Sequence, residues 1–257
     1  MPDNFQAVLV LSFGGPEKPD DVMPFLENVL RGKNVPRERM LEVAEHYYHF
    51  GGRSPINEQN RQLIAALTAL LNEEGPNLPI YWGNRNWHPL LPDTLKRMAD
   101  DGVKRALAFV TSAYSSYSGC RQYLENIEEA RAPVGPAAPV VDKLRAYYNH
   151  PGFIDPNIEN VAAALNQVPA SRRGQAHLIF TAHSIPSDMA ANCDYRRQLL
   201  EAGGLIAKGV GHESWRLAYQ SRSGSPHQPW LEPDICDYLR EVHAAGITDV
   251  VVAPIGF

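Results

Sequence analysis

Residues 178–186 read Leu-Ile-Phe-Thr-Ala-His-Ser-Ile-Pro. The run opens with apolar and β-favouring residues and ends abruptly in His183, Ser184 and Pro186. In an open α/β sheet, ligands and catalytic groups collect at the carboxyl ends of the strands. The stretch therefore predicts a buried strand with His183 at the rim of a cleft, where an imidazole can accept a proton or bind a metal.

Strand and helix patterns alternate on both sides of this stretch, which is typical of βαβ units and a mostly parallel sheet. Strands are predicted at residues 7–13, 78–82, 105–111, 177–182, 216–220 and 249–253. Helices are predicted at residues 22–32, 37–48, 93–101, 123–130, 158–168, 195–208 and 234–244, and around Leu63 to Leu71. The fold class is therefore α/β, in two similar halves. A loop rich in proline and alanine at residues 132–139 places the boundary, with an N-terminal lobe at 1–131 and a C-terminal lobe at 132–257.

The composition narrows the class of protein. The 257 residues include 24 lysines and arginines against 29 aspartates and glutamates, a net charge of −5, which argues against nucleic-acid binding. Apolar stretches are far shorter than the ~20 residues of a membrane span, and the first residues lack a basic signal-peptide start. The three cysteines, Cys120, Cys193 and Cys236, are widely spaced. They predict reduced thiols in a cytoplasmic protein.

Six segments, in order along the whole chain, resemble the ferrochelatases, which insert ferrous iron into a porphyrin. The segments are Leu11-Ser12-Phe13-Gly14-Gly15-Pro16, Gly51 to Asn57, Gly83 to Trp87, Phe180 to Pro186, Tyr219 to Asp234 and Pro254-Ile255-Gly256-Phe257. The pattern is most similar to the actinobacterial branch, whose members act on coproporphyrin III rather than protoporphyrin IX. The resemblance implies an enzyme of heme biosynthesis, a lyase with two Rossmann-like, chelatase-type lobes and a porphyrin cleft between them.

Metallating a porphyrin requires removal of the pyrrole N–H protons and delivery of dehydrated Fe²⁺ to the ring centre. A neutral imidazole suits both tasks, since it accepts protons near pH 7 and binds transition metals. By resemblance, His183 is the catalytic residue and the iron ligand. The alternative is a strand-end histidine whose ring is satisfied by the backbone.

A porphyrin also needs an apolar slot with polar groups at its rim. The resemblance matches Ser54 and Tyr123 to positions that contact the porphyrin carboxylates, with Arg31 and Tyr47 as neighbours. Phe13 stands where some relatives carry an iron-ligating tyrosine. A phenyl ring cannot ligate iron, so Phe13 is expected to pack against the macrocycle. The alternative for Ser54, Tyr123, Arg31 and Tyr47 is ordinary loop capping or a half-buried aromatic side chain.

The family pattern continues beyond Phe257 with an acidic turn whose glutamate faces the histidine across the porphyrin, so we expect either a fragment or a short form. Some actinobacterial relatives carry a [2Fe–2S] cluster, whose mostly C-terminal ligands are not present in these residues. Fe²⁺ is then the substrate, the porphyrin is the expected partner, and we expect a monomer. Two other functions stay open: a porphyrin-binding chain without metallation activity, and a chelatase for another tetrapyrrole, such as a sirohydrochlorin-type substrate.

Overall fold

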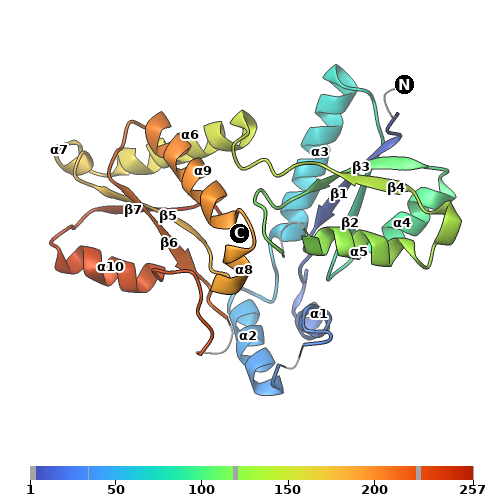
Figure 1. The fold of residues 1–257 in the computed structure, drawn as a ribbon, viewed down its shortest axis with the longest axis horizontal. Coiled ribbons are helices and arrows are strands. Elements are labelled where there is room, and N and C mark those ends of the chain that lie inside the picture. Colours follow the sequence, from blue (N-terminus) through green and yellow to red (C-terminus); the bar gives the residue numbers. More distant parts are fainter. Residues whose placement is uncertain (1–3, 34, 118–120, 224–226, 257) are drawn as a thin grey trace. The chain divides into compact units, whose positions relative to one another are not determined.

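The computed structural model describes residues 4–33, 35–117, 121–223 and 227–256 (Figure 1). Cys120, Gly224 and Phe257, which the sequence analysis names, lie outside these ranges. The chain forms two compact units: unit 1 comprises Met1–Thr111 and Tyr123–Leu144, and unit 2 comprises Ser112–Gln122 and Arg145–Phe257. The single boundary expected after residue 131 stays a prediction, and the description below follows the two units.

Unit 1 is built on a four-stranded parallel sheet in the order β2-β1-β3-β4. Its strands are β1 (Ala7–Ser12), β2 (Ile80–Asn84), β3 (Arg105–Val110) and β4 (Val140–Lys143). Its helices are α1 (Val22–Val29), α2 (Arg37–His49), α3 (Ile56–Glu74), α4 (Leu91–Asp100) and α5 (Gln122–Arg131), with short 3₁₀ turns at Pro19–Asp21 and Gly135–Ala137. Strand β1 is buried along its whole length, as its continuous apolar sequence predicts.

Two apolar clusters hold unit 1 together. In one, Leu9 and Leu11 of β1 pack with Leu95 of α4 and Ile127 of α5. In the other, Phe25 of α1 lies among residues of α1 and α2, with Phe13, Tyr47 and Trp87 packed against them. Full burial of each such side chain contributes roughly 1.5–3 kcal/mol, so these clusters fix the strand ends from which the candidate site is built.

Two details of unit 1 differ from the prediction. The strand predicted at residues 78–82 extends further, because β2 continues through Asn84, which is fully buried and donates to the backbone carbonyl of His88 at 3.1 Å. Strand β4 was not predicted, because its four residues at the sheet edge combine an exposed Val140 with two charged side chains. An ion pair of 2.7 Å between Arg105 and Asp142 ties it to β3.

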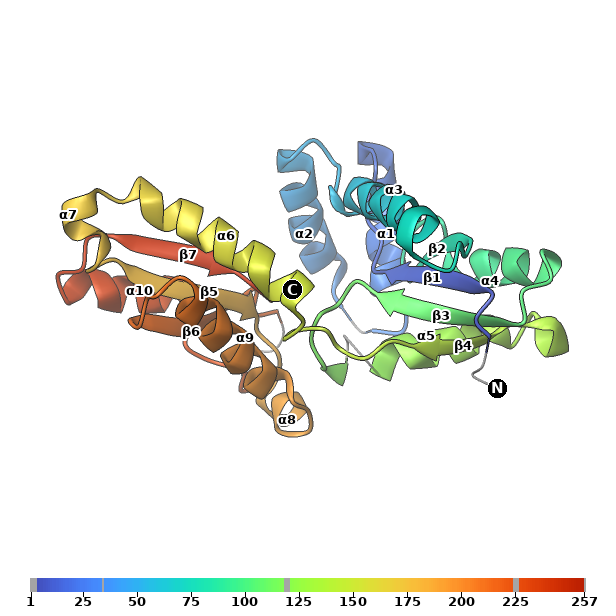
Figure 2. The same cartoon turned by 90° about the horizontal axis from the view of Figure 1, so that it is seen from above.

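Unit 2 contains a three-stranded parallel sheet in the order β6-β5-β7. Its strands are β5 (His177–His183), β6 (Trp215–Gln220) and β7 (Val250–Pro254). Its helices are α6 (Pro151–Gln167), α7 (Ala170–Arg173), α8 (Ser187–Ala191), α9 (Tyr195–Gly209) and α10 (Ile235–Ala244). Helices α6 and α9 lie against the sheet in Figure 2 and share its main core, whereas α10 contacts β6. Two parallel sheets flanked by helices confirm the predicted α/β class.

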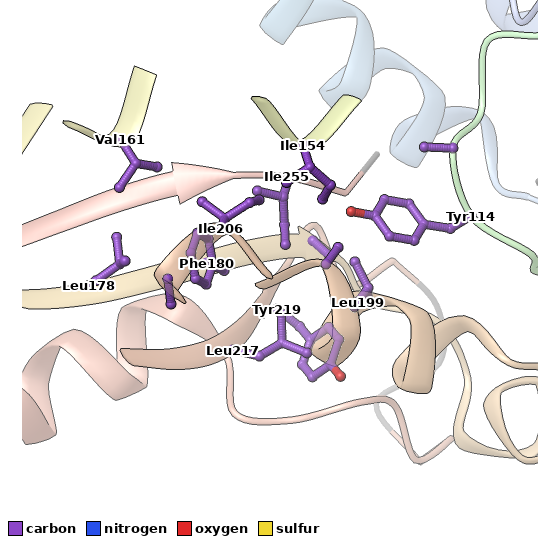
Figure 3. Packing of buried hydrophobic residues seen from close by; sticks show 14 of the residues in the cluster. Tyr114, Ile154, Val161, Leu178, Phe180, Leu199, Ile206, Leu217, Tyr219 and Ile255 are labelled. Carbon is purple, nitrogen blue, oxygen red and sulfur yellow. The ribbon is translucent and has the colours of Figure 1, made fainter. Parts of the chain in front are cut away.

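The core of unit 2 forms where alternate residues of β5 meet α6 and α9 (Figure 3). Leu178 and Phe180 point into this layer together with Leu199 and Ile206 of α9. The Phe180 ring packs edge-on against Trp215, with ring centroids 5.4 Å apart. The buried body of β5 therefore provides a rigid support for its last residue, His183.

Within the described part of the chain, no helix is long and apolar enough to span a membrane.

Candidate active site

The carboxyl ends of β1 and β2 lie side by side in unit 1. Phe13 directly follows β1 and Arg85 directly follows β2, and the register pairs Ser12 with Asn84. Beyond the last paired residues the Arg85 N–H donates to the Ser12 carbonyl at 3.0 Å, and the Asn86 N–H donates to the Phe13 carbonyl at 3.1 Å. The backbone thus holds Phe13 and Arg85 next to each other, at the edge where parallel sheets bind ligands.

The Arg85 guanidinium lies close to two aromatic rings. Its central carbon is 5.7 Å from the centroid of Phe13 and 4.8 Å from that of Tyr123, near the start of α5. Such contacts stabilise a cation by roughly 0.5–2 kcal/mol. Burial raises the pKa of the Tyr123 hydroxyl, while the charge and hydrogen bond of Arg85 act in the opposite direction. The net pKa is still raised, so Tyr123 is a neutral hydrogen-bonding group beside a fixed positive charge.

Ser54 lies against the glycine turn that follows β1. Its N–H donates to the Pro16 carbonyl at 2.8 Å, and a Cβ added to Gly15 would stand 2.7 Å from the Ser54 Cβ. The Ser54 hydroxyl accepts from the N–H of Ile56 at 3.4 Å, at the start of α3. The capping role considered for Ser54 is therefore present, and it places the hydroxyl at the same edge of the sheet.

Tyr47 and Arg31 are linked to the same strand ends through Phe25 and Asn28, and the Asn28 side chain donates to the Asn86 carbonyl at 3.4 Å. The Tyr47 ring lies 5.8 Å from Phe25, which lies 6.2 Å from Phe13, and burial raises the pKa of the Tyr47 hydroxyl. Arg31 is exposed and donates to the Asn28 side-chain oxygen at 2.5 Å. The structure thus brings the five predicted residues of unit 1 into the neighbourhood of one sheet edge. Their contact with a porphyrin stays a prediction.

His183 is the last residue of β5 in unit 2, and its side chain is partly exposed. Its Nδ1 lies 2.5 Å from the Ser184 carbonyl oxygen. A carbonyl can only accept, so Nδ1 carries the proton and Nε2 keeps the lone pair. The backbone contact considered as an alternative is therefore real, but it occupies one ring nitrogen and leaves the other chemically available.

The cysteines that the structure describes are Cys193 and Cys236. The Cys193 sulfur donates to the Ala190 carbonyl at 3.9 Å, and Cys236 is exposed near the start of α10. Within residues 4–33, 35–117, 121–223 and 227–256, no group of three or more His, Cys, Asp or Glu side chains is arranged to hold a metal.

The sequence analysis did not identify Arg85 as a site residue. It lies beyond the strand predicted at residues 78–82, and only the structure shows the guanidinium beside two rings distant in the sequence. The available signal was a cation three residues after the strand predicted at residues 78–82, because strand ends at the carboxyl edge collect ligand-binding groups.

Together, these features define a class: a two-unit α/β protein with a metal-competent imidazole at one strand end and a cationic, aromatic cluster at another. A family model described as Ferrochelatase matches residues 5–257, and the chain belongs to the ferrochelatase family. This confirms the resemblance on which the sequence analysis relied.

Similar proteins include a Ferrochelatase of Rhodopirellula baltica, 60% identical over 254 residues, which span 98% of this chain and 72% of that protein. A Coproporphyrin III ferrochelatase of Streptomyces coelicolor is 53% identical over 272 residues, covering 98% and 72% respectively. Another Coproporphyrin III ferrochelatase, of Nocardia farcinica, is 55% identical over 260 residues, covering 98% and 74%.

Proposed function

We propose that this protein inserts Fe²⁺ into a porphyrin in heme biosynthesis and that coproporphyrin III is its preferred substrate. Membership of the ferrochelatase family supports the reaction, and relatives named Coproporphyrin III ferrochelatase at 53% and 55% identity support the substrate. The observation that carries the proposal is the lone pair on Nε2 of His183 at the end of β5. Iron is a substrate here and not a resident cofactor.

The reaction exchanges two pyrrole N–H protons for one Fe²⁺, so the charge on the macrocycle is unchanged. Nε2 of His183 accepts one of these protons from a pyrrole nitrogen while the other passes to solvent water, or it donates its lone pair to the incoming iron and both protons pass to water. A neutral imidazole suits both roles, because the lone pair on one ring nitrogen can accept a proton or bind a transition metal. The Ser184 carbonyl keeps the Nδ1 proton and supports the imidazolium that forms.

Unit 1 supplies groups that suit the substrate's periphery. Arg85 and Arg31 offer positive charge to the porphyrin carboxylates, and Ser54 and Tyr123 offer hydroxyls. Phe13 and Tyr47 offer aromatic surface to the macrocycle. Coproporphyrin III carries more carboxylates than protoporphyrin IX, so a rim with two arginines favours it.

An anaerobic assay of Fe²⁺ insertion with coproporphyrin III and protoporphyrin IX tests the proposal. We expect metallation of both porphyrins and a higher kcat/KM for coproporphyrin III. Binding of porphyrin without metallation would instead make the protein a porphyrin-binding chain. Failure to bind either porphyrin, with metallation of a sirohydrochlorin-type substrate, would assign the site to another tetrapyrrole.

We expect Arg85→Met to weaken coproporphyrin binding by roughly 10- to 100-fold, because a hydrogen bond to a charged group contributes about 1.5–3 kcal/mol. The affinity is measured by quenching of porphyrin fluorescence. Arg97→Met is the matched control, since Arg97 also lies over a tyrosine ring, that of Tyr81, at 5.5 Å. Arg97 lies in the last turn of α4, which leads to the start of β3. It is therefore near the amino ends of the strands, at the opposite edge of the sheet from Arg85. Equal losses in both variants would exclude a specific role for Arg85.

A further inference from the structure

The peptide group between His183 and Ser184 is held at both of its polar atoms. The Tyr195 hydroxyl donates to the His183 carbonyl at 3.0 Å. The Ser184 N–H donates to the Gln220 carbonyl of β6 at 2.8 Å. These two bonds fix the rotation of the peptide plane. Without them, the polar atoms of a peptide at a strand end would bond to water and the plane could rotate.

The fixed peptide determines where the imidazole finds its acceptor. The Ser184 carbonyl, which takes the Nδ1 proton of His183, belongs to the next peptide along the chain. Ser184 is itself held in place. The residue is 2% exposed, and its hydroxyl donates to the Leu231 carbonyl at 2.8 Å. The backbone rotation at residue 183 determines where this carbonyl lies relative to the His183 ring that it contacts. The order of the strand end thus depends on what holds the His183 carbonyl.

Tyr195 is placed to hold that carbonyl rigidly. It is the first residue of α9, it is 3% exposed, and it lies in the core of unit 2. Its ring packs edge-on against Tyr114 with centroids 6.0 Å apart. The Tyr195 hydroxyl must be the donor in this bond, because a carbonyl oxygen can only accept.

We propose that Tyr195 is a positioning residue for His183: its hydroxyl, bonded to the His183 carbonyl, keeps the Ser184 carbonyl under Nδ1 and so keeps the lone pair on Nε2. The consequence for catalysis rests on the proposed function, but the consequence for the tautomer of His183 does not. Residues that orient a metal-binding imidazole through its other nitrogen change metal affinity or activity by about 10- to 100-fold. Tyr195 does not contact the imidazole directly but acts on it through the backbone of residues 183 and 184.

Tyr114 provides a matched control in the same aromatic cluster. It is 2% exposed, and within the described residues its buried hydroxyl has no hydrogen-bond partner. Figure 3 shows Tyr114 in the core of unit 2. Tyr114→Phe therefore removes the same atom as Tyr195→Phe from the same packing environment, without removing a bond to His183.

The experiment reads the His183 tautomer by ¹⁵N NMR of the imidazole in the porphyrin-free protein, at a pH where the ring is neutral. His183→Gln identifies the resonances. We expect the wild type and Tyr114→Phe to be predominantly Nδ1–H, and Tyr195→Phe to shift several-fold toward Nε2–H. In the metallation assay we expect Tyr195→Phe to lower kcat about 10-fold with KM for the porphyrin unchanged, and Tyr114→Phe to stay within about twofold.

An unchanged tautomer ratio in Tyr195→Phe, or an equal shift in Tyr114→Phe, would overturn the proposal. If Tyr195→Phe does not fold, the wild type still decides: the Tyr195 hydroxyl proton must be detectable through slow exchange and must show contact with the His183–Ser184 backbone. If no variant metallates a porphyrin while the tautomer shifts as expected, the proposed function fails and the positioning role of Tyr195 stands.

Discussion

His183→Ala is expected to abolish iron insertion, lowering kcat by roughly 10³-fold or more, while porphyrin affinity stays within about twofold. General acid–base catalysis contributes about 10²- to 10⁴-fold, and in the proposed mechanism His183 is also the nitrogen ligand for the incoming Fe²⁺. The proposed porphyrin contacts lie on unit 1, so the substitution leaves them in place. Single-turnover metallation and fluorescence quenching measure the two quantities separately.

His177→Gln is the control for this experiment because His177 begins the same strand, β5, that His183 ends. The His177 ring nitrogens contact Ser214 at 3.2 Å and Tyr238 at 2.7 Å, so its role is structural. We expect normal metallation by His177→Gln. Turnover like that of the wild type in His183→Ala would remove His183 from the mechanism and leave the family membership unaffected.

The position of His183 was predictable because its strand carries a strong local signal. Residues 177–183 form β5 in the structure. An apolar run that ends in a polar residue predicts a buried strand whose last residue lies at the edge of the sheet. The same reasoning located five other strands. It missed β4, whose short sequence carries two charged residues and whose pairing depends on β3 rather than on its own pattern.

The surroundings of Arg85 and Tyr195 were not predictable because their partners are distant in the sequence. The two rings beside Arg85 belong to Phe13 and Tyr123, and the carbonyl bound by Tyr195 belongs to His183. Periodicity reports which face of an element is buried and says nothing about which side chains meet there. A family resemblance can carry over matched positions, but these contacts require coordinates.

In helix α3, too, the apolar periodicity of the sequence does not predict which residues make the contacts. Its leucines suggest an apolar contact face, yet Leu63 and Leu70 are 37% and 51% exposed, and its buried residues are Asn57 and Asn60. The Asn57 amide donates to the Gly15 carbonyl at 3.3 Å and to the His88 carbonyl at 3.2 Å. Buried polar groups must be satisfied, so these bonds, rather than apolar periodicity, tie the start of α3 to the turn after β1.

The loop that leads into Ser54 gives the second large expected effect, on stability. Gly51 and Gly52 both have left-handed backbones, with φ of 77° and 69°. A Cβ on Gly51 would meet nothing within 4 Å, whereas a Cβ on Gly52 would lie 2.5 Å from the Cα of Pro19. Gly51→Ala therefore incurs conformational strain alone, about 1–2 kcal/mol. Gly52→Ala incurs the same strain and also a clash with backbone that cannot rotate away.

We expect Gly52→Ala to lower the free energy of unfolding by about 3–5 kcal/mol and Gly51→Ala by about 1–2 kcal/mol. For a chain of this size about 1 kcal/mol corresponds to roughly 2–4 °C in Tm, so thermal melting separates the two variants. Since the Ser54 N–H is bonded to Pro16 at 2.8 Å, moving Gly52 away from Pro19 also displaces Ser54. Coproporphyrin affinity should therefore fall in Gly52→Ala and stay near normal in Gly51→Ala. Equal melting shifts would show that the segment at Pro19 yields freely, and that Gly52 is needed only for its backbone conformation.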